Sequence, residues 1–112
     1  MRPGAIALAR IQQADGRLKT RPVLLLSQMP PYSDYLVCAL SSKLHHECPG
    51  FDEVLAADDD DFKGSGLKIA SLVQLGMVAT IPQSVILGEL GMISETRLQR
   101  LRSRLARHIG DE

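Results

Sequence analysis

An arginine directly before a proline is the first feature of this sequence that could do chemistry. The stretch RLKTRPVLLLS, residues 17–27, places Arg21 and Pro22 at the start of an apolar run. Proline cannot donate to a β-ladder, so we expect Pro22 at the first residue of a strand or on an edge, with Arg21 held in extended backbone. A guanidinium held in this way presents a planar fork of donors that matches phosphate oxygens. Arg21 is therefore either a surface arginine ahead of a strand or an anion clamp.

Two other clusters have the residue types of metal sites without the spacing. Residues 45–48, HHEC, include adjacent histidines, which on a strand would point to opposite faces, and they lack a tetrahedral zinc pattern. Read as a calcium loop, the run Asp58–Asp61 puts Phe62 where a ligand is required. We interpret the first cluster as a polar loop. The second is a solvated loop, or else a shield for a basic groove.

Apolar segments predict the strands that must position these residues. We expect strands at 4–11, 23–27, 35–42, 52–56 and 67–75, and two shorter apolar pieces around Pro82. Asp15-Gly16 predicts a hairpin turn between the first two strands. The uninterrupted apolar run of the second strand predicts burial on both faces.

The C-terminal segment predicts one helix. Ser94 is a suitable N-cap, and Gly110 a suitable end. Leucine and isoleucine recur at helical spacing, at Leu98, Leu101, Leu105 and Ile109. Arginines form a neighbouring stripe that we interpret as solvated, with contacts to a binding partner as the alternative: Arg97, Arg100, Arg104 and Arg107. Several short strands and one helix predict a mainly β (α+β) fold. We expect a small barrel or strongly bent sheet that the helix closes on one side. The whole chain, residues 1–112, is expected to form a single domain.

Composition excludes several classes of protein. With 112 residues, 45% apolar and 23% charged, the chain has the make-up of a globular domain, and no apolar run is long enough to span a membrane. The N-terminal segment lacks an export signal, so we expect a cytoplasmic protein with free thiols at Cys38 and Cys48. The net charge of zero argues against a general polyanion binder. It hides an asymmetry, because residues 1–46 carry six Lys and Arg against two Asp and Glu, whereas residues 47–66 carry one against seven.

The order and spacing of several short motifs resemble one protein family over nearly the whole chain. The motifs are Gly4-Ala5-Ile6, Arg21-Pro22-Val23-Leu24 with Ser27, Leu40-Ser41-Ser42-Lys43, Gly66-Leu67, Ala70-Ser71 with Val73, Ala79-Thr80-Ile81, Ser84-Val85-Ile86 and Leu90-Gly91-Met92-Ile93-Ser94. The sequence resembles the PemK/MazF-like toxins of type II toxin–antitoxin systems, which are cytoplasmic endoribonucleases. The resemblance implies a small SH3-like β-barrel with a C-terminal α-helix. It also implies a homodimer, an antitoxin that blocks an RNA groove, and operator DNA bound only together with that antitoxin.

The same resemblance implies a reaction and its residues. The family cleaves single-stranded RNA by attack of a 2′-OH on the adjacent phosphorus, with no metal and no cofactor. By the match, Arg21 and Ser41 are the catalytic residues, and Asp15 is the candidate general base by position. Some members carry an acidic residue near the position of Ser71, where this chain has none. Flanking RNA contacts are expected from Arg17, Lys19, Thr20, Ser42 and Lys43.

Two alternatives to an active nuclease remain. The first is a catalytically degenerate barrel that acts as a binding or regulatory module, in keeping with the neutral charge, the absent carboxylate and only four aromatic residues. The second is a DNA-binding regulator, which would draw on the arginine-rich helix. Cleavage of RNA, or its absence, separates these alternatives from the nuclease.

Overall fold

A six-stranded antiparallel sheet is the main element of the computed structural model, which describes residues 1–111. In chain order its elements are β1 (Ala5–Gln12), β2 (Leu18–Met29), β3 (Asp34–Ser41), the 3₁₀ turn η1 (Leu44–His46), β4 (Glu53–Leu55), α1 (Phe62–Ser65), β5 (Ser71–Ile81), the 3₁₀ turn η2 (Gln83–Val85), β6 (Ile86–Met92) and α2 (Glu95–Gly110).

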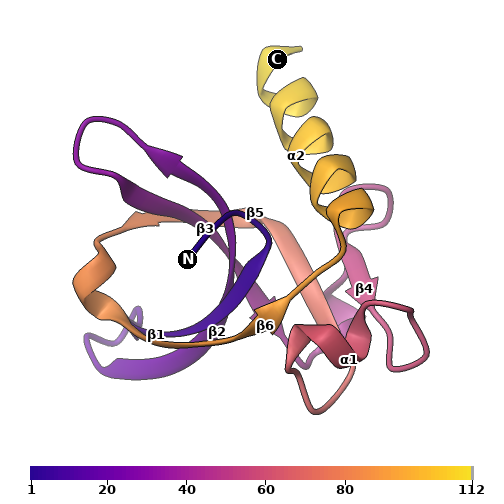
Figure 1. Ribbon diagram of the computed structural model, residues 1–112, viewed down its shortest axis with the longest axis horizontal. Coiled ribbons are helices and arrows are strands. Elements are labelled where there is room, and N and C mark those ends of the chain that lie inside the picture. Colours follow the sequence, from indigo (N-terminus) through magenta and orange to yellow (C-terminus); the bar gives the residue numbers. More distant parts are fainter. Residues whose placement is uncertain (112) are drawn as a thin grey trace.

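The strand order is β4-β5-β3-β2-β1-β6, and every pair is antiparallel. The sheet is strongly curled, and α2 leaves it from the end of β6 and runs along one side (Figure 1). This arrangement confirms the predicted mainly β fold with a C-terminal helix. In the described part of the chain, no helix is both long and apolar enough to cross a membrane.

Both faces of the central strand β2 are buried, as its uninterrupted apolar run predicted. Side chains alternate across a strand. Leu24 and Leu26 therefore join the core between the sheet and α2, whereas Val23 and Leu25 join a second core on the opposite face. The first core is completed by Leu98 and other α2 side chains. The central strand β2 thus lies between two buried apolar clusters.

The helix α2 begins where the sequence predicted. The Ser94 hydroxyl oxygen accepts a hydrogen bond from the Arg97 backbone N–H at 3.1 Å, which satisfies one of the unpaired donors of the first turn. Leu98 and Leu101 are buried, and Leu105 packs against them. The predicted apolar stripe is wrong at its last position, because Ile109 lies beyond the sheet and is 63% exposed.

The segment before β5 differs from the sequence-based prediction. The expected strand at 67–75 begins only at Ser71 and continues to Ile81. Its first residues pair with the short strand β4. The acidic segment, expected to be all loop, contains the single turn α1, which ends at Gly66 with a positive φ of 76°. This turn packs backbone to backbone on β6, because a Cβ on Gly66 or on Gly91 would collide with a carbonyl oxygen of the other segment.

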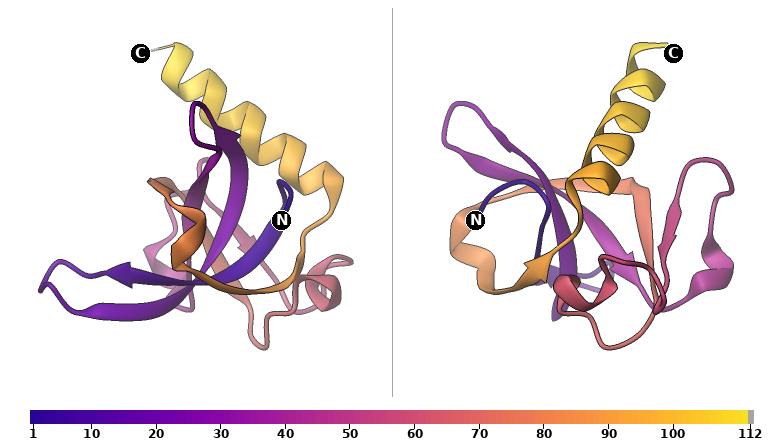
Figure 2. Two further views of the ribbon diagram at one scale, coloured as in Figure 1. Left: turned by 60° about the vertical axis from the view of Figure 1, so that its left-hand side comes forward. Right: turned by 45° about the vertical axis from the view of Figure 1, so that its right-hand side comes forward.

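Pro22 lies inside a strand and not at its first residue. β2 begins at Leu18, but only its pairing with β1 extends that far, since the pairing with β3 begins at Val23. Before Val23, β2 has no partner on the side of β3, so Pro22 lies at the point where this side of β2 becomes a sheet edge. A residue without an N–H is tolerated at such an edge. The β1–β2 hairpin continues past this point as an arm that extends from the sheet (Figure 2).

Candidate functional site

A groove of about 530 Å³ lies where the β1–β2 arm, the end of β3 and the middle of β5 meet. Its polar lining residues are Gln13, Arg21, Ser41, Lys43, His46 and Gln74. Three of them, Arg21, Ser41 and Lys43, were predicted from the sequence as parts of one site. The fold brings them to a common surface from segments about twenty residues apart.

The backbone of Arg21 is held by β2, where it is paired with Ala9 of β1. Its side chain is exposed, and Nη2 donates to Oε1 of Gln13 at 3.3 Å. Gln13 in turn donates from Nε2 to the carbonyl oxygen of Ile11 at 3.4 Å. Gln13 thus links the guanidinium to the end of β1, and the remaining guanidinium donors are available to an anion.

Ser41 ends β3, and its side chain shapes the turn that follows. Its hydroxyl oxygen accepts from the backbone N–H of Lys43 at 3.1 Å. The hydroxyl proton is still available for donation, because accepting a hydrogen bond uses only a lone pair. The strand end and the turn thus contribute Ser41 and the exposed Lys43 to the lining of the same groove as Arg21.

A bulge in β5 forms the far wall of the groove. Ala39 pairs with Gln74 and Cys38 pairs with Val78, so three residues of β5 are left without partners on β3. The backbone N–H of Leu75, inside this bulge, donates to Oδ1 of the buried Asp52 at 3.0 Å. The other carboxylate oxygen accepts from the backbone N–H of Cys48 at 2.9 Å. Asp52 therefore ties the bulge to the end of the segment that carries Lys43.

Three polar lining residues were missed as site residues by sequence reasoning. Gln13 and Gln74 carry no pattern that distinguishes them from other surface glutamines. His46 was considered only as a member of a metal-like cluster that was interpreted as a polar loop. It follows the Ser-Ser-Lys motif by three residues, and the turn η1 brings it back to the groove. In residues 1–111, no group of three or more His, Cys, Asp or Glu side chains could hold a metal ion.

The other predicted site residues lie away from the groove lining. Asp15 is in the hairpin turn, where Oδ1 accepts from the backbone N–H of Arg17 at 3.0 Å. Lys19 and Thr20 are exposed on the β1–β2 arm, and alternation puts Lys19 on the side of Arg21. Ser42 is exposed in the turn after β3.

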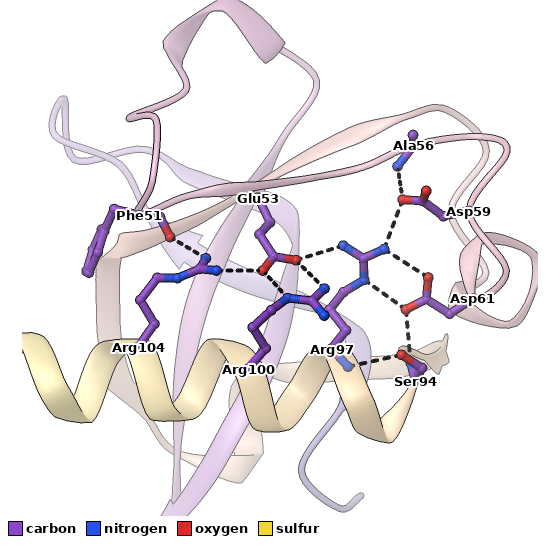
Figure 3. A network of polar contacts seen from close by, with 9 residues as sticks. All are labelled: Phe51, Glu53, Ala56, Asp59, Asp61, Ser94, Arg97, Arg100 and Arg104. Atoms are coloured by element: carbon purple, nitrogen blue, oxygen red, sulfur yellow. Dashed lines mark hydrogen bonds and ion pairs between the residues drawn. The ribbon is translucent and has the colours of Figure 1, made fainter.

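The acidic segment forms an ion-pair network with α2 (Figure 3). The network corrects two predictions, namely that the acidic run is a solvated loop and that the arginine stripe of the helix is solvated. Arg97, only 8% exposed, donates from Nε to Oδ2 of Asp61 at 2.9 Å and from Nη2 to Oδ1 at 3.1 Å. It also reaches Asp59 and Glu53, each at 2.9 Å. Burial alone would raise the pKa of Asp61, but hydrogen bonds from Arg97 and from the Ser94 N–H outweigh it and lower the pKa to about 2.

Glu53 continues the network along the helix. Its carboxylate is 2.6 Å from Nε of Arg100 and 3.0 Å from Nη2 of Arg104. Burial opposes ionisation of Glu53, yet the hydrogen bond from Arg100 and the positive charges of the three arginines hold its pKa below the usual value. Three helix arginines are thus neutralised within the fold, because their stripe faces β4 and the acidic segment. The cations of the groove, Arg21 and Lys43, lie outside this network.

Fold and groove together define a small, mainly β protein with a groove whose lining includes the cations Arg21 and Lys43. The sequence matches the family of PemK-like, MazF-like toxins of type II toxin–antitoxin systems over residues 2–109. The chain therefore belongs to this toxin family. Its structure is similar to that of the Mycobacterium tuberculosis toxin MazF-mt6, with a TM-score of 0.69, 17% sequence identity and 96% of each chain covered. No curated protein matches the sequence.

Proposed function

We propose that this toxin is an endoribonuclease that cleaves single-stranded RNA without a metal ion or a cofactor. The observation that carries the proposal is that Arg21 and Ser41 line one groove with Lys43. A groove with two cations and a hydroxyl donor suits a phosphate chain. Membership of the toxin family supports the same reaction.

In the proposed reaction, the 2′-oxygen attacks the adjacent phosphorus and the bond to the 5′-oxygen breaks. The products are a cyclic phosphate and a free 5′-OH. Negative charge accumulates on the non-bridging oxygens in the transition state, and the Arg21 guanidinium and Ser41 hydroxyl donate hydrogen bonds to them. Lys43 binds a flanking phosphate, and Lys19 and Arg17 extend this track along the arm.

The remaining parts of the proposal concern partners. The toxin acts in the cytoplasm as a homodimer, and an antitoxin inhibits it by covering the groove. Operator DNA is bound only by the toxin–antitoxin complex, because three of the five arginines of α2 are engaged in the ion-pair network.

The first test is cleavage of a long, mostly unstructured RNA in the presence of a chelator. Wild type, Arg21→Ala and the control Arg102→Ala are compared, because Arg102 is an exposed arginine of α2 outside the groove. We expect wild type and Arg102→Ala to cut at the same discrete sites. Loss of one such donor should slow Arg21→Ala by about 10²–10³-fold. Equal cleavage by all three proteins would remove Arg21 from the mechanism.

A second candidate function is RNA binding without cleavage. It is favoured by one observation, namely that no carboxylate is among the groove-lining residues in the described part of the chain. If wild type binds the RNA but leaves it intact at protein excess, the chain is a binding module on the toxin fold. Binding that Arg21→Ala weakens would then assign the groove to that role.

A further inference from the structure

The groove is rich in hydrogen-bond donors and poor in bases. Arg21 and Lys43 have only donors, and Ser41 already accepts from the Lys43 N–H. The amides of Gln13 and Gln74 do not take up a proton near neutral pH. A 2′-OH must lose its proton as it attacks phosphorus, so an acceptor is the function that these residues leave unfilled.

We propose that His46 is the general base of this groove, an inference that rests on the proposed ribonuclease function. Among the lining residues of the described chain it is the one imidazole, the side-chain type used most often as a general base. The sequence-based candidate, Asp15, lies instead in the hairpin turn with a carboxylate oxygen bonded to the Arg17 N–H.

The turn η1 explains how His46 reaches the groove. Its backbone N–H donates to the carbonyl oxygen of Lys43 at 3.1 Å, which folds the chain back on itself directly after the Ser-Ser-Lys motif. The ring of His45 stands edge-on to the ring of His46, with centroids 4.3 Å apart. His46 lines the groove, whereas its neighbour does not. The pair therefore provides two adjacent imidazoles of which one is placed for chemistry.

The charged and titratable groups around His46 are few. Arg21 of β2 and Lys43 of the preceding turn line the same groove as His46, His45 shares its turn, and Glu47 follows it in the chain. The facing part of β5, from Gln74 to Ala79, contains no ionisable side chain. The groove lining in the described chain therefore offers no carboxylate and no second imidazole as an alternative base.

The proton balance of the step is as follows. The neutral imidazole takes the proton of the 2′-OH while the bond from O2′ to phosphorus forms. The bond from phosphorus to O5′ breaks, and the leaving oxygen takes a proton from a solvent water. The hydroxide that remains accepts the proton from the imidazolium, which returns His46 to its starting state.

The test compares His46→Gln with the matched control His45→Gln, using the RNA sites mapped for wild type. For wild type and His45→Gln, we expect kcat/KM to rise about tenfold per pH unit at acidic pH and then to level off. His46→Gln should be slower by about 10²–10⁴-fold and should lose this dependence. Added imidazole should restore part of the rate to His46→Gly, which a purely structural role would not allow.

Binding and folding are measured in the same proteins. A short RNA with 2′-deoxyribose at the attacking position cannot react, and it should bind wild type and His46→Gln with affinities within about threefold. Unaltered kcat/KM and pH profile in His46→Gln, or activity that falls as the pH rises, would overturn the general-base role while leaving the ribonuclease in place. Absence of cleavage by wild type would instead overturn the proposed function itself, and the role of His46 with it.

Discussion

Arg97 of α2 and Asp61 of the acidic segment form a two-point ion pair, with Nε to Oδ2 at 2.9 Å and Nη2 to Oδ1 at 3.1 Å. Asp61 also accepts from the backbone N–H of Ser94 at 3.0 Å, so it binds both the start of the helix and its first arginine. The pair fixes where α2 leaves the sheet. It also holds the acidic segment against the helix. Carboxylates of this segment therefore pair with α2 and not with Arg21 or Lys43 of the groove.

Replacement of Arg97 should destabilise the protein strongly. Arg97→Ala leaves three carboxylates without their shared partner, two of them nearly buried, and removal of one partner from a buried pair costs about 3–5 kcal/mol. Arg97→Lys keeps the charge but loses the two-point geometry, so we expect a smaller loss. Urea unfolding measures both, with the exposed Arg102→Ala as control. A change below about 0.5 kcal/mol in Arg97→Ala, the range of ordinary surface substitutions, would show that the network does not hold the helix.

Stability should fall in acid because of Asp61. Its pKa is about 2 in the folded state against an ordinary value of 3.8, so the carboxylate favours folding fully above about pH 5 and progressively less toward pH 2. The expected contribution is on the order of 1 kcal/mol, since solvent at the rim screens part of the attraction. The free energy of unfolding of Asp61→Asn should depend less steeply on pH over this range. The exposed Asp58→Asn should keep the wild-type slope, and a wild-type slope in Asp61→Asn would contradict the prediction.

The contact between α1 and β6 should tolerate no side chain at Gly91. A Cβ there would collide with the carbonyl oxygen of Gly64 and with the backbone of Ser65, and backbone cannot move aside as a flexible side chain can. Gly91→Ala should therefore cost about 1–3 kcal/mol in chemical denaturation. On the same strand, a Cβ at Gly88 has open space around it, so Gly88→Ala serves as the matched control. Equal midpoints for the two variants would mean that the two segments separate easily.

The two cysteines should differ in reactivity. Cys38 lies in the core, where burial raises the pKa of its thiol to about 12, with the charge of Asp52 adding to the effect, whereas Cys48 is exposed. Because the thiolate is the reactive form, a thiol reagent at pH 8 should label one cysteine in the native protein and two in the unfolded one. Cys48→Ser should lose the native labelling. Rapid labelling of native Cys48→Ser would show that the core opens readily.

Lys43 should contribute to RNA affinity through charge alone, if the proposed function holds. Its neutralisation of one phosphate predicts that Lys43→Ala lowers the magnitude of the slope of log K against log salt by about 0.7 for a single strand. Arg102→Ala should leave the slope unchanged. A slope that is equal in wild type and Lys43→Ala would place the phosphate chain elsewhere than in the groove.

The sequence by itself determined the features that depend on local chemistry. Alternation and apolar runs located most strands, and the double burial of Val23 to Leu26 followed from an uninterrupted apolar run. The Ser94 cap and the leucine spacing located α2. Short motifs such as Arg21-Pro22 and Ser41-Ser42-Lys43 were sufficient to identify the family, because their order is preserved along the chain.

Only the tertiary structure decided which distant groups meet. Arg97 and Asp61 are 36 positions apart, and no local rule pairs the arginines of a helix with one acidic segment and not with solvent. The bulge in β5 depends on a carboxylate from the segment before β4, and the return of His46 to the groove depends on the turn η1. The contacts of Asp61 with Arg97 and of Asp52 with the bulge are non-local and are selected by packing of the whole sheet. The sequence therefore pointed to Arg21, Ser41 and Lys43, whereas Gln13, Gln74 and His46 became apparent as lining residues only in the fold.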